Sequence, residues 1–153
     1  MSEKTERAKE LFKSGYNCSQ SVFAVFAEEL GVDFKTALKL SLPFGGGMGR
    51  MREVCGAVSG MFAAAGLAYA SDDNSAENKK EMYKKVQELA QRFKDKNSSI
   101  VCRELLSGVN SETSPEPEKR TQEYYKKRPC VDLVCDAASI LEEYMKENKP
   151  VNA

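Results

Sequence analysis

Apolar side chains recur every three or four residues along most of this chain, a spacing typical of helices that pack on a common core. The clearest case is residues 76–95, where Met82, Leu89 and Phe93 form one stripe between lysines and glutamates. No segment alternates apolar and polar residues as a half-buried strand does. The sequence therefore predicts an all-α fold, a single compact multi-helix bundle built by one helical domain over residues 1–153.

Glycines, prolines and polar capping residues separate the predicted helices. Gly15 and Gly31 stand where a left-handed residue would close the first two helices, and Asp33 can cap the start of the third. The longest loop is expected at 107–117. The predicted helices are 3–14, 17–30, 34–41, 53–70, 76–95, 99–106, 117–127 and 130–147.

Composition excludes several classes of function. The chain has five cysteines and no histidine, so it holds no Ser-His-Asp or Cys-His catalytic pair and no zinc site built on imidazole. Its 23 basic and 23 acidic side chains balance, and nucleic acid is therefore not expected as a partner. The basic aromatic run at 124–128 is predicted to be a helix surface.

No membrane span or signal peptide is expected. The first ten residues are rich in charge, and the uncharged stretch 54–70 is shorter than the roughly 20 residues a span needs. We therefore predict a cytoplasmic protein. Thiols stay reduced in that compartment unless they do redox chemistry or hold a metal, so the cysteines are expected to carry the chemistry.

Four of the five cysteines fall on apolar faces of predicted helices. Three of these also lie near helix starts, where free N–H groups and a partial positive charge favour a thiolate. A reduced cysteine also packs well as a small hydrophobe, so plain core packing is the alternative. The four are Cys18, Cys55, Cys102 and Cys130, and the three near helix starts are Cys18, Cys55 and Cys130.

Cys55 is the strongest catalytic candidate. It follows a glycine-rich segment at 44–49 and then Arg50 and Arg52, and it opens a predicted helix. The helix end and either arginine would stabilise a thiolate there, which could act as a nucleophile or a metal ligand. The alternative is that the glycines only form a tight turn.

Gly56 and Gly60 leave one face of the helix after Cys55 almost without side chains. A glycine inside a helix costs about 1 kcal/mol relative to alanine, so something is expected to approach this backbone closely. Either another helix packs there, or a bulky group such as a cluster or a substrate disulfide is held beside Cys55. In the second case the two glycines are cofactor-binding residues.

Cys135 is the spare thiol. It lies five residues after Cys130 on one predicted helix, about 140° around the axis, so the two do not form a vicinal redox pair. The chain also lacks the Cys-x-x-Cys spacing of thioredoxin-like sites and zinc ribbons.

The cysteines and their neighbours resemble a known family. Residues 55–60 read Cys-Gly-Ala-Val-Ser-Gly, after Gly-Tyr-Asn-Cys at 15–18 and before Cys-Arg-Glu-Leu-Leu at 102–106 and Cys130. Over about residues 10–146 this arrangement resembles the C_GCAxxG_C_C family, small bacterial chains named for their four cysteines and central motif. The resemblance implies redox activity carried by Cys18, Cys55, Cys102 and Cys130, and it names no substrate.

Three functions fit these residues. In a thiol-redox protein, Cys55 would attack a disulfide of an unidentified redox partner, and Cys18, Cys102 or Cys130 would resolve the mixed disulfide. In a metal-thiolate protein, the same four cysteines would hold an iron–sulfur cluster or zinc. In the third, the chain is a non-catalytic helical partner, for example of a membrane transporter component, with its cysteines in the core.

Overall fold

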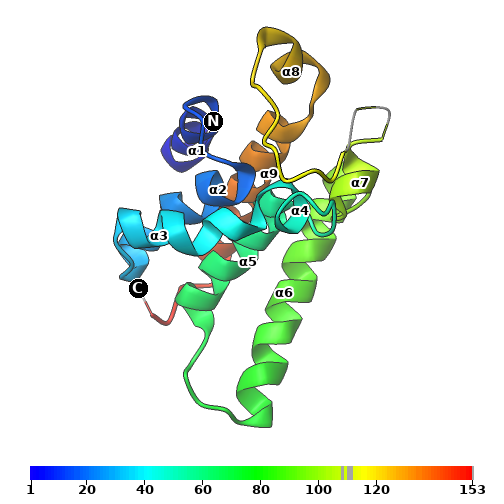
Figure 1. Cartoon of the computed structure of the whole chain (residues 1–153). Coiled ribbons are helices and arrows are strands. Elements are labelled where there is room, and N and C mark those ends of the chain that lie inside the picture. The colour runs from blue at the N-terminus through cyan, green and yellow to red at the C-terminus, as the bar shows by residue number, and fades with distance from the viewer. Residues whose placement is uncertain (108, 110–111, 153) are drawn as a thin grey trace.

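The computed structural model describes residues 1–107, 109 and 112–152. Over these residues the fold is all-α, as predicted, and its helices enclose a shared hydrophobic core (Figure 1). In chain order, with η marking short 3-10 helices, the elements are α1 (Glu3–Lys13), α2 (Cys18–Ala27), η1 (Glu28–Leu30), α3 (Phe34–Ser41), η2 (Leu42–Phe44), α4 (Gly45–Met48), α5 (Gly56–Tyr69), α6 (Ala76–Asn97), α7 (Cys102–Leu105), α8 (Gln122–Lys127) and α9 (Cys130–Glu147).

Helices α2 and α5 form the centre of the molecule and pack closely against each other. Every residue of α2 after Cys18 is buried, and α5 contributes small or apolar side chains to the same core. At Gly60 the two backbones approach so closely that an added Cβ would lie 2.7 Å from the carbonyl oxygen of Ser19. A second helix thus occupies the bare face of α5 at this glycine.

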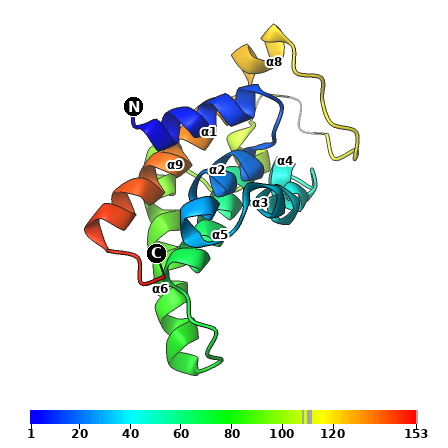
Figure 2. The ribbon, with the colours of Figure 1, turned by 90° about the vertical axis from the view of Figure 1, so that its left-hand side faces the viewer.

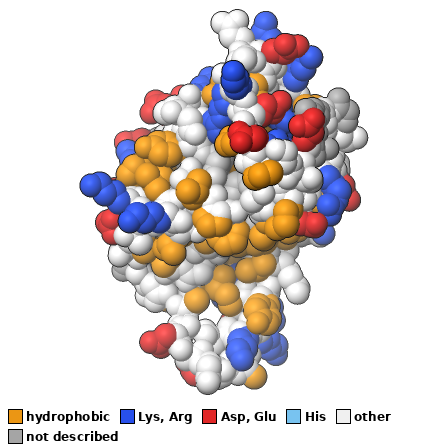
Figure 3. Space-filling view, viewed as in Figure 1, with side chains coloured by type: hydrophobic (Ala, Val, Ile, Leu, Met, Phe, Trp, Pro, Cys, Tyr) orange, Lys and Arg blue, Asp and Glu red, His pale blue; other side chains and the backbone are white. Residues whose placement is uncertain are grey.

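The other helices cover this pair. α1 and α9 lie together against one side of it, and α6 runs along another (Figures 1 and 2). α6 buries Leu89 and Phe93 in its second half, while its first half projects beyond the rest of the bundle. On the face seen in Figure 3, hydrophobic side chains spread across the middle of the molecule and charged ones gather around α8 at the top.

The helix boundaries follow the predictions closely in the bundle. The bounds of α3 and α9 agree with the predicted ones, and Gly15 and Gly31 adopt positive φ angles of 113° and 95° after the first helices. In the part of the chain described, no helix is long and apolar enough to cross a membrane.

Three predicted helices are shorter than expected. In two of them the first residues pair with another segment of the backbone and do not join the helix. The predicted helix 53–70 begins at Gly56, and the predicted helix 99–106 keeps only Cys102–Leu105, since Val54 and Val101 form an isolated β-bridge. The predicted helix 117–127 begins at Gln122, so the loop extends further than 107–117. Of that loop, residues 108, 110 and 111 lie outside the described part of the chain.

The close approach at Gly60 generates a test of the fold. We expect Gly60→Ala to lower the free energy of unfolding by about 1–3 kcal/mol, because the new methyl group overlaps the α2 backbone. Gly66→Ala in the same helix is the matched control. Nothing lies within 4 Å of a Cβ added there, so this change should raise stability by about 0.4–1 kcal/mol. Urea unfolding of both variants measures the difference, and equal stabilities would contradict the packing described.

Candidate functional site: a cavity lined by four thiols

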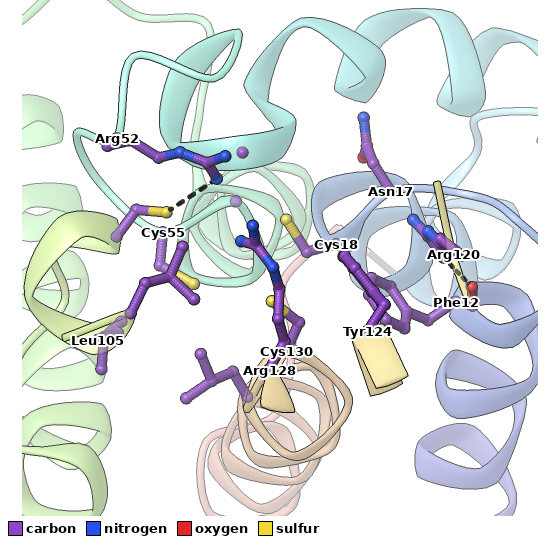
Figure 4. A pocket seen from close by; sticks show the side chains of 15 residues that line it. Phe12, Asn17, Cys18, Arg52, Cys55, Leu105, Arg120, Tyr124, Arg128 and Cys130 are labelled. Atoms are coloured by element: carbon purple, nitrogen blue, oxygen red, sulfur yellow. Dashed lines mark hydrogen bonds between the residues drawn. The ribbon is translucent and has the colours of Figure 1, made fainter. Parts of the chain in front are cut away.

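The four cysteines singled out from the sequence line one cavity, which we call the thiol cavity. Its volume is about 80 Å³, and one water molecule needs roughly 10–15 Å³ of such space, so a group of several non-hydrogen atoms fits inside. Figure 4 shows the side chains of Cys18, Cys55 and Cys130 pointing into the same space. Further lining residues are Phe12, Asn17, Gly46, Arg52, Gly56, Leu105, Leu106, Arg120, Tyr124, Arg128 and Leu133.

Each of the four cysteines stands at the start of a helix. Cys18, Cys102 and Cys130 are the first residues of α2, α7 and α9, and Cys55 is the N-cap residue of α5. The sequence predicted this for Cys18, Cys55 and Cys130. The sequence did not place Cys102 at a helix start, because the predicted helix 99–106 begins three residues before this cysteine.

A left-handed turn, which includes most of the short element α4, borders the cavity on one side. Residues 46–50 all have positive φ angles between 60° and 72°, and Arg52 has a φ of 61°. A non-glycine residue in this region costs roughly 1–2 kcal/mol, and the segment includes Met48, Arg50 and Arg52. The glycines therefore form more than a tight turn: they allow an unusual path that brings the side chain of Arg52 to the cavity.

Gly47 permits a close contact within this turn. An added Cβ would lie 2.6 Å from the Cβ of Cys102 and 2.9 Å from the Cα of Arg52. The absence of a side chain at this position lets the turn wrap around Cys102.

A short backbone pairing fixes Cys55 and Cys102 relative to each other. The N–H of Cys55 donates to the carbonyl oxygen of Ile100 at 2.8 Å, and the N–H of Cys102 donates to that of Glu53 at 2.6 Å. Around these bonds Val54 and Val101 form the antiparallel β-bridge. Two helix starts that lie far apart in the sequence are thus held side by side.

Burial dominates the ionisation of three of the thiols. Burial raises the pKa of Cys130 to about 12, raises that of Cys18 and raises that of Cys55 well above its usual value. The N–H groups of Ala57 and Val58 do lower the pKa of Cys55, as expected at a helix start, but the loss of water outweighs them. Negative charge on Cys18 would raise the pKa of both Cys55 and Cys130 further.

Arg52 contacts Cys102, whereas the sequence predicts that an arginine supports Cys55. Its Nη1 donates to the Cys102 sulfur at 3.8 Å, drawn as a dashed line in Figure 4, and its Nε donates to the carbonyl oxygen of Glu112 at 3.0 Å. Arg50 instead binds the loop, donating from Nη1 to the carbonyl oxygen of Ser114 at 2.8 Å. A cationic donor is thus directed at the sulfur of Cys102.

Two more cavity arginines were not expected. Arg128 is 7% exposed and forms an ion pair with Glu118, while Arg120 donates to the carbonyl oxygens of Phe12 and Tyr16. The prediction that 124–128 is a helix surface is thus wrong for its two ends, since Tyr124 and Arg128 line the cavity. Their spacing of four residues places both on one side of the chain and was the signal available in the sequence.

The two glycines predicted to bind a cofactor have different surroundings. Gly56 lines the cavity, and a Cβ added there would lie 2.4 Å from the Cys18 sulfur. Gly60 faces the backbone of α2 and does not line the cavity. Cys135, expected to be the spare thiol, also lies outside the cavity lining.

The thiols line the cavity without converging on one point. In the residues that the structure describes, no group of three or more Cys, Asp or Glu side chains is arranged to hold a metal ion. Four thiolates are chemically suited to zinc or an iron–sulfur cluster. Such a centre would require their sulfur atoms to move toward one another, and it stays a prediction.

Comparison with known proteins agrees with the sequence resemblance. The sequence model of the family described as "Putative redox-active protein (C_GCAxxG_C_C)" matches residues 16–144. The chain belongs to this family. An uncharacterized protein of Archaeoglobus fulgidus is 27% identical over 159 aligned residues, which cover 96% of this chain and 99% of that protein. No solved structure matches the chain.

The buried thiols predict a pH dependence of stability. A thiol with a raised pKa keeps its proton in the folded state, whereas in the unfolded chain it ionises from about pH 8.5. Its stabilising effect is therefore complete below that pH and is lost as the pH rises toward the folded value, which is about 12 for Cys130. Each such thiol contributes a fall of up to about 1.4 kcal/mol per pH unit within this window.

Urea unfolding of the reduced protein between pH 8 and 10 measures this slope. The Cys130→Ala variant should show a shallower fall than the unmodified protein, because one of the protonated thiols is missing. An identical slope in the two proteins would contradict the raised pKa of Cys130.

Proposed function

We propose that this protein carries out thiol–disulfide redox chemistry in the thiol cavity. The main support is that all four cysteines line a single cavity, where a buried guanidinium donates to one of them. Membership of a family described as redox-active supports the same conclusion. Disulfide exchange needs one thiol that can carry negative charge and a second that can close on it.

Cys102 is proposed as the attacking thiol, in place of the Cys55 favoured by the sequence. Arg52 is 5% exposed, and its guanidinium donates to the Cys102 sulfur, so charge on that sulfur meets a positive partner with little screening by water. The raised pKa of Cys55 makes its thiolate less accessible at neutral pH.

Cys18 is proposed as the resolving thiol. Among the charge effects on Cys18, that of Cys102 is the largest, and Cys18 in turn has the largest charge effect on Cys55 and Cys130. The N–H of Gly46 also lowers the pKa of Cys18, so the left-handed turn assists its ionisation against the effect of burial. Charge on Cys102 thus acts on Cys18, and charge on Cys18 acts on Cys55 and Cys130.

The reaction balances with a disulfide as the oxidant. The Cys102 thiolate attacks one sulfur of the substrate disulfide, whose S–S bond breaks and releases the first substrate thiolate. That thiolate takes up the proton of Cys18, and the Cys18 sulfur then attacks Cys102 in the mixed disulfide and releases the second thiolate. Two electrons pass from the protein to the substrate, and the protein keeps a Cys18–Cys102 disulfide.

Mild oxidation of the reduced protein tests this assignment. We expect one intramolecular disulfide, mapped by mass spectrometry of peptides to Cys18 and Cys102, which Cys102→Ser abolishes. Cys135→Ser is the control and should leave the disulfide unchanged, since Cys135 does not line the cavity. A Cys18–Cys55 disulfide would restore Cys55 as the attacking thiol, and five unmodified thiols would overturn the proposed function.

Arg52→Gln tests the partner of the attacking thiol. Loss of the charge beside Cys102 should slow its alkylation by iodoacetamide at pH 7 about 10-fold, because the sulfur loses its cationic hydrogen-bond donor. Arg103→Gln is the matched control: Arg103 is next to Cys102 in sequence, but its side chain is exposed and pairs with Glu53. Equal rates in the two variants would remove Arg52 from the proposed mechanism.

A metal-thiolate centre is the second candidate, favoured by the same grouping of four soft ligands around one cavity. Metal analysis and visible absorption of protein purified without oxygen distinguish it from thiol redox. Stoichiometric zinc or iron lost in Cys18→Ser and retained in Cys135→Ser would support the metal centre, and metal-free protein that forms the disulfide would support exchange.

A further inference from the structure

The thiol cavity shares part of its lining with a larger hollow, which we call the basic basin. Its volume is about 790 Å³. The basin and the cavity share Asn17, Gly46, Arg52, Arg120, Tyr124 and Arg128 as lining residues. A molecule that reaches the thiols by this route passes the arginines first.

Positive charge is concentrated around the basic basin. Five of its lining side chains are cationic and one is a carboxylate, although the whole chain has no net charge. The carboxylate, Glu118, is paired with Arg128. The cationic side chains are Lys13, Arg50, Arg52, Arg120 and Arg128.

Three of the arginines lack a carboxylate partner in the described part of the chain. Arg50 donates only to the carbonyl oxygens of Glu112 and Ser114. Arg52 donates to a thiol and a carbonyl oxygen, and Arg120 donates to two carbonyl oxygens and lies 4.1 Å from the centre of the Phe12 ring. The carbonyl oxygens and the ring supply no negative charge, and the Cys102 sulfur supplies it only as the thiolate that reacts. A buried guanidinium is costly without a counter-charge, and Arg52 is 5% exposed.

We propose that the substrate of this site is a small disulfide that carries negative charge. The proposal rests on the proposed thiol chemistry. The carboxylate or other anionic groups of the substrate lie in the basic basin against Arg120 and Lys13. The S–S bond of the substrate reaches Cys102 beside Arg52. The bound anion supplies the counter-charge that these side chains otherwise lack, and guanidinium groups suit planar carboxylates in particular.

The basin also accounts for access to a buried thiol. A hollow lined by charge of one sign raises the local concentration of oppositely charged ligands and their association rate, by 10-fold to 1000-fold in known cases. The same field repels cationic disulfides. Salt weakens both effects, since the screening length falls to about 3 Å at 1 M.

Two disulfides of similar size and opposite charge test the proposal. Dithiodipropionate carries two carboxylates and cystamine two ammonium groups. The quantity measured is the rate with dithiodipropionate divided by the rate with cystamine. At low salt we expect this ratio to be about 10-fold or more higher for the reduced, folded protein than for the urea-unfolded protein. The excess should shrink as salt is added.

Charge variants locate the effect in the basin. Lys13→Gln should lower the rate with dithiodipropionate and leave or raise that with cystamine. Lys39→Gln is the matched control, because Lys39 is also an exposed lysine but belongs to α3 and does not line the basin. Equal responses of the two variants would overturn the role of the basin.

A second pair of reagents separates this proposal from the proposed redox function. Iodoacetate and iodoacetamide alkylate thiols without disulfide exchange and differ in charge. If iodoacetate is favoured but neither disulfide reacts, the basin attracts anions and the redox function is wrong. If the disulfides react with no preference for negative charge, the redox function stands and the anionic substrate is overturned. If no reagent reaches the cavity thiols of the folded protein, both proposals fail.

Discussion

The contact between α2 and α5 determines most of what the site can do. Gly60 allows the two helices to approach closely, and Gly56, one turn earlier on α5, leaves room for the Cys18 sulfur. The same contact therefore orders the core and brings the start of α2 to the start of α5. A side chain at either glycine would separate the helices and move Cys18 away from the cavity. The contact that packs the bundle therefore also brings the cysteines of α2 and α5 together.

Two electrostatic effects oppose each other at these thiols. A helix start offers N–H groups and a partial positive charge that stabilise a thiolate, whereas burial removes the water that would solvate it. For Cys18, Cys55 and Cys130 burial prevails, and their pKa values are raised. Even the charge of Arg128, which lowers the pKa of Cys130, does not offset its burial. At Cys102 the guanidinium of Arg52 donates directly to the sulfur. The left-handed turn that delivers Arg52 is therefore as important to the site as the cysteines are.

The sequence predicted those features that depend on local pattern. Helical periodicity indicated the all-α fold and the bounds of α3 and α9, and the apolar faces selected the four cysteines that line the cavity. It did not predict the left-handed turn at 46–50, because the positive φ angles of Met48 and Arg50 depend on contacts made around them. It assigned the arginine to Cys55, its near neighbour in sequence, since the pairing of residues 52–55 with 100–103 is a tertiary contact between distant segments. For the same reason the predicted helices 53–70 and 99–106 include residues that in the structure form this pairing.

Net charge illustrates the same limit in the electrostatics. Equal numbers of acidic and basic residues gave no reason to expect an anionic ligand, yet the fold gathers five cationic side chains and one carboxylate around a single hollow. Lys13, Arg50 and Arg120 come from segments far apart in the chain, so no window of the sequence contains the cluster. Their field acts over roughly the 8–10 Å screening length of physiological salt, which is comparable to the distance across such a hollow. A ligand near the thiols therefore experiences this local field, whereas distant surface carboxylates are screened.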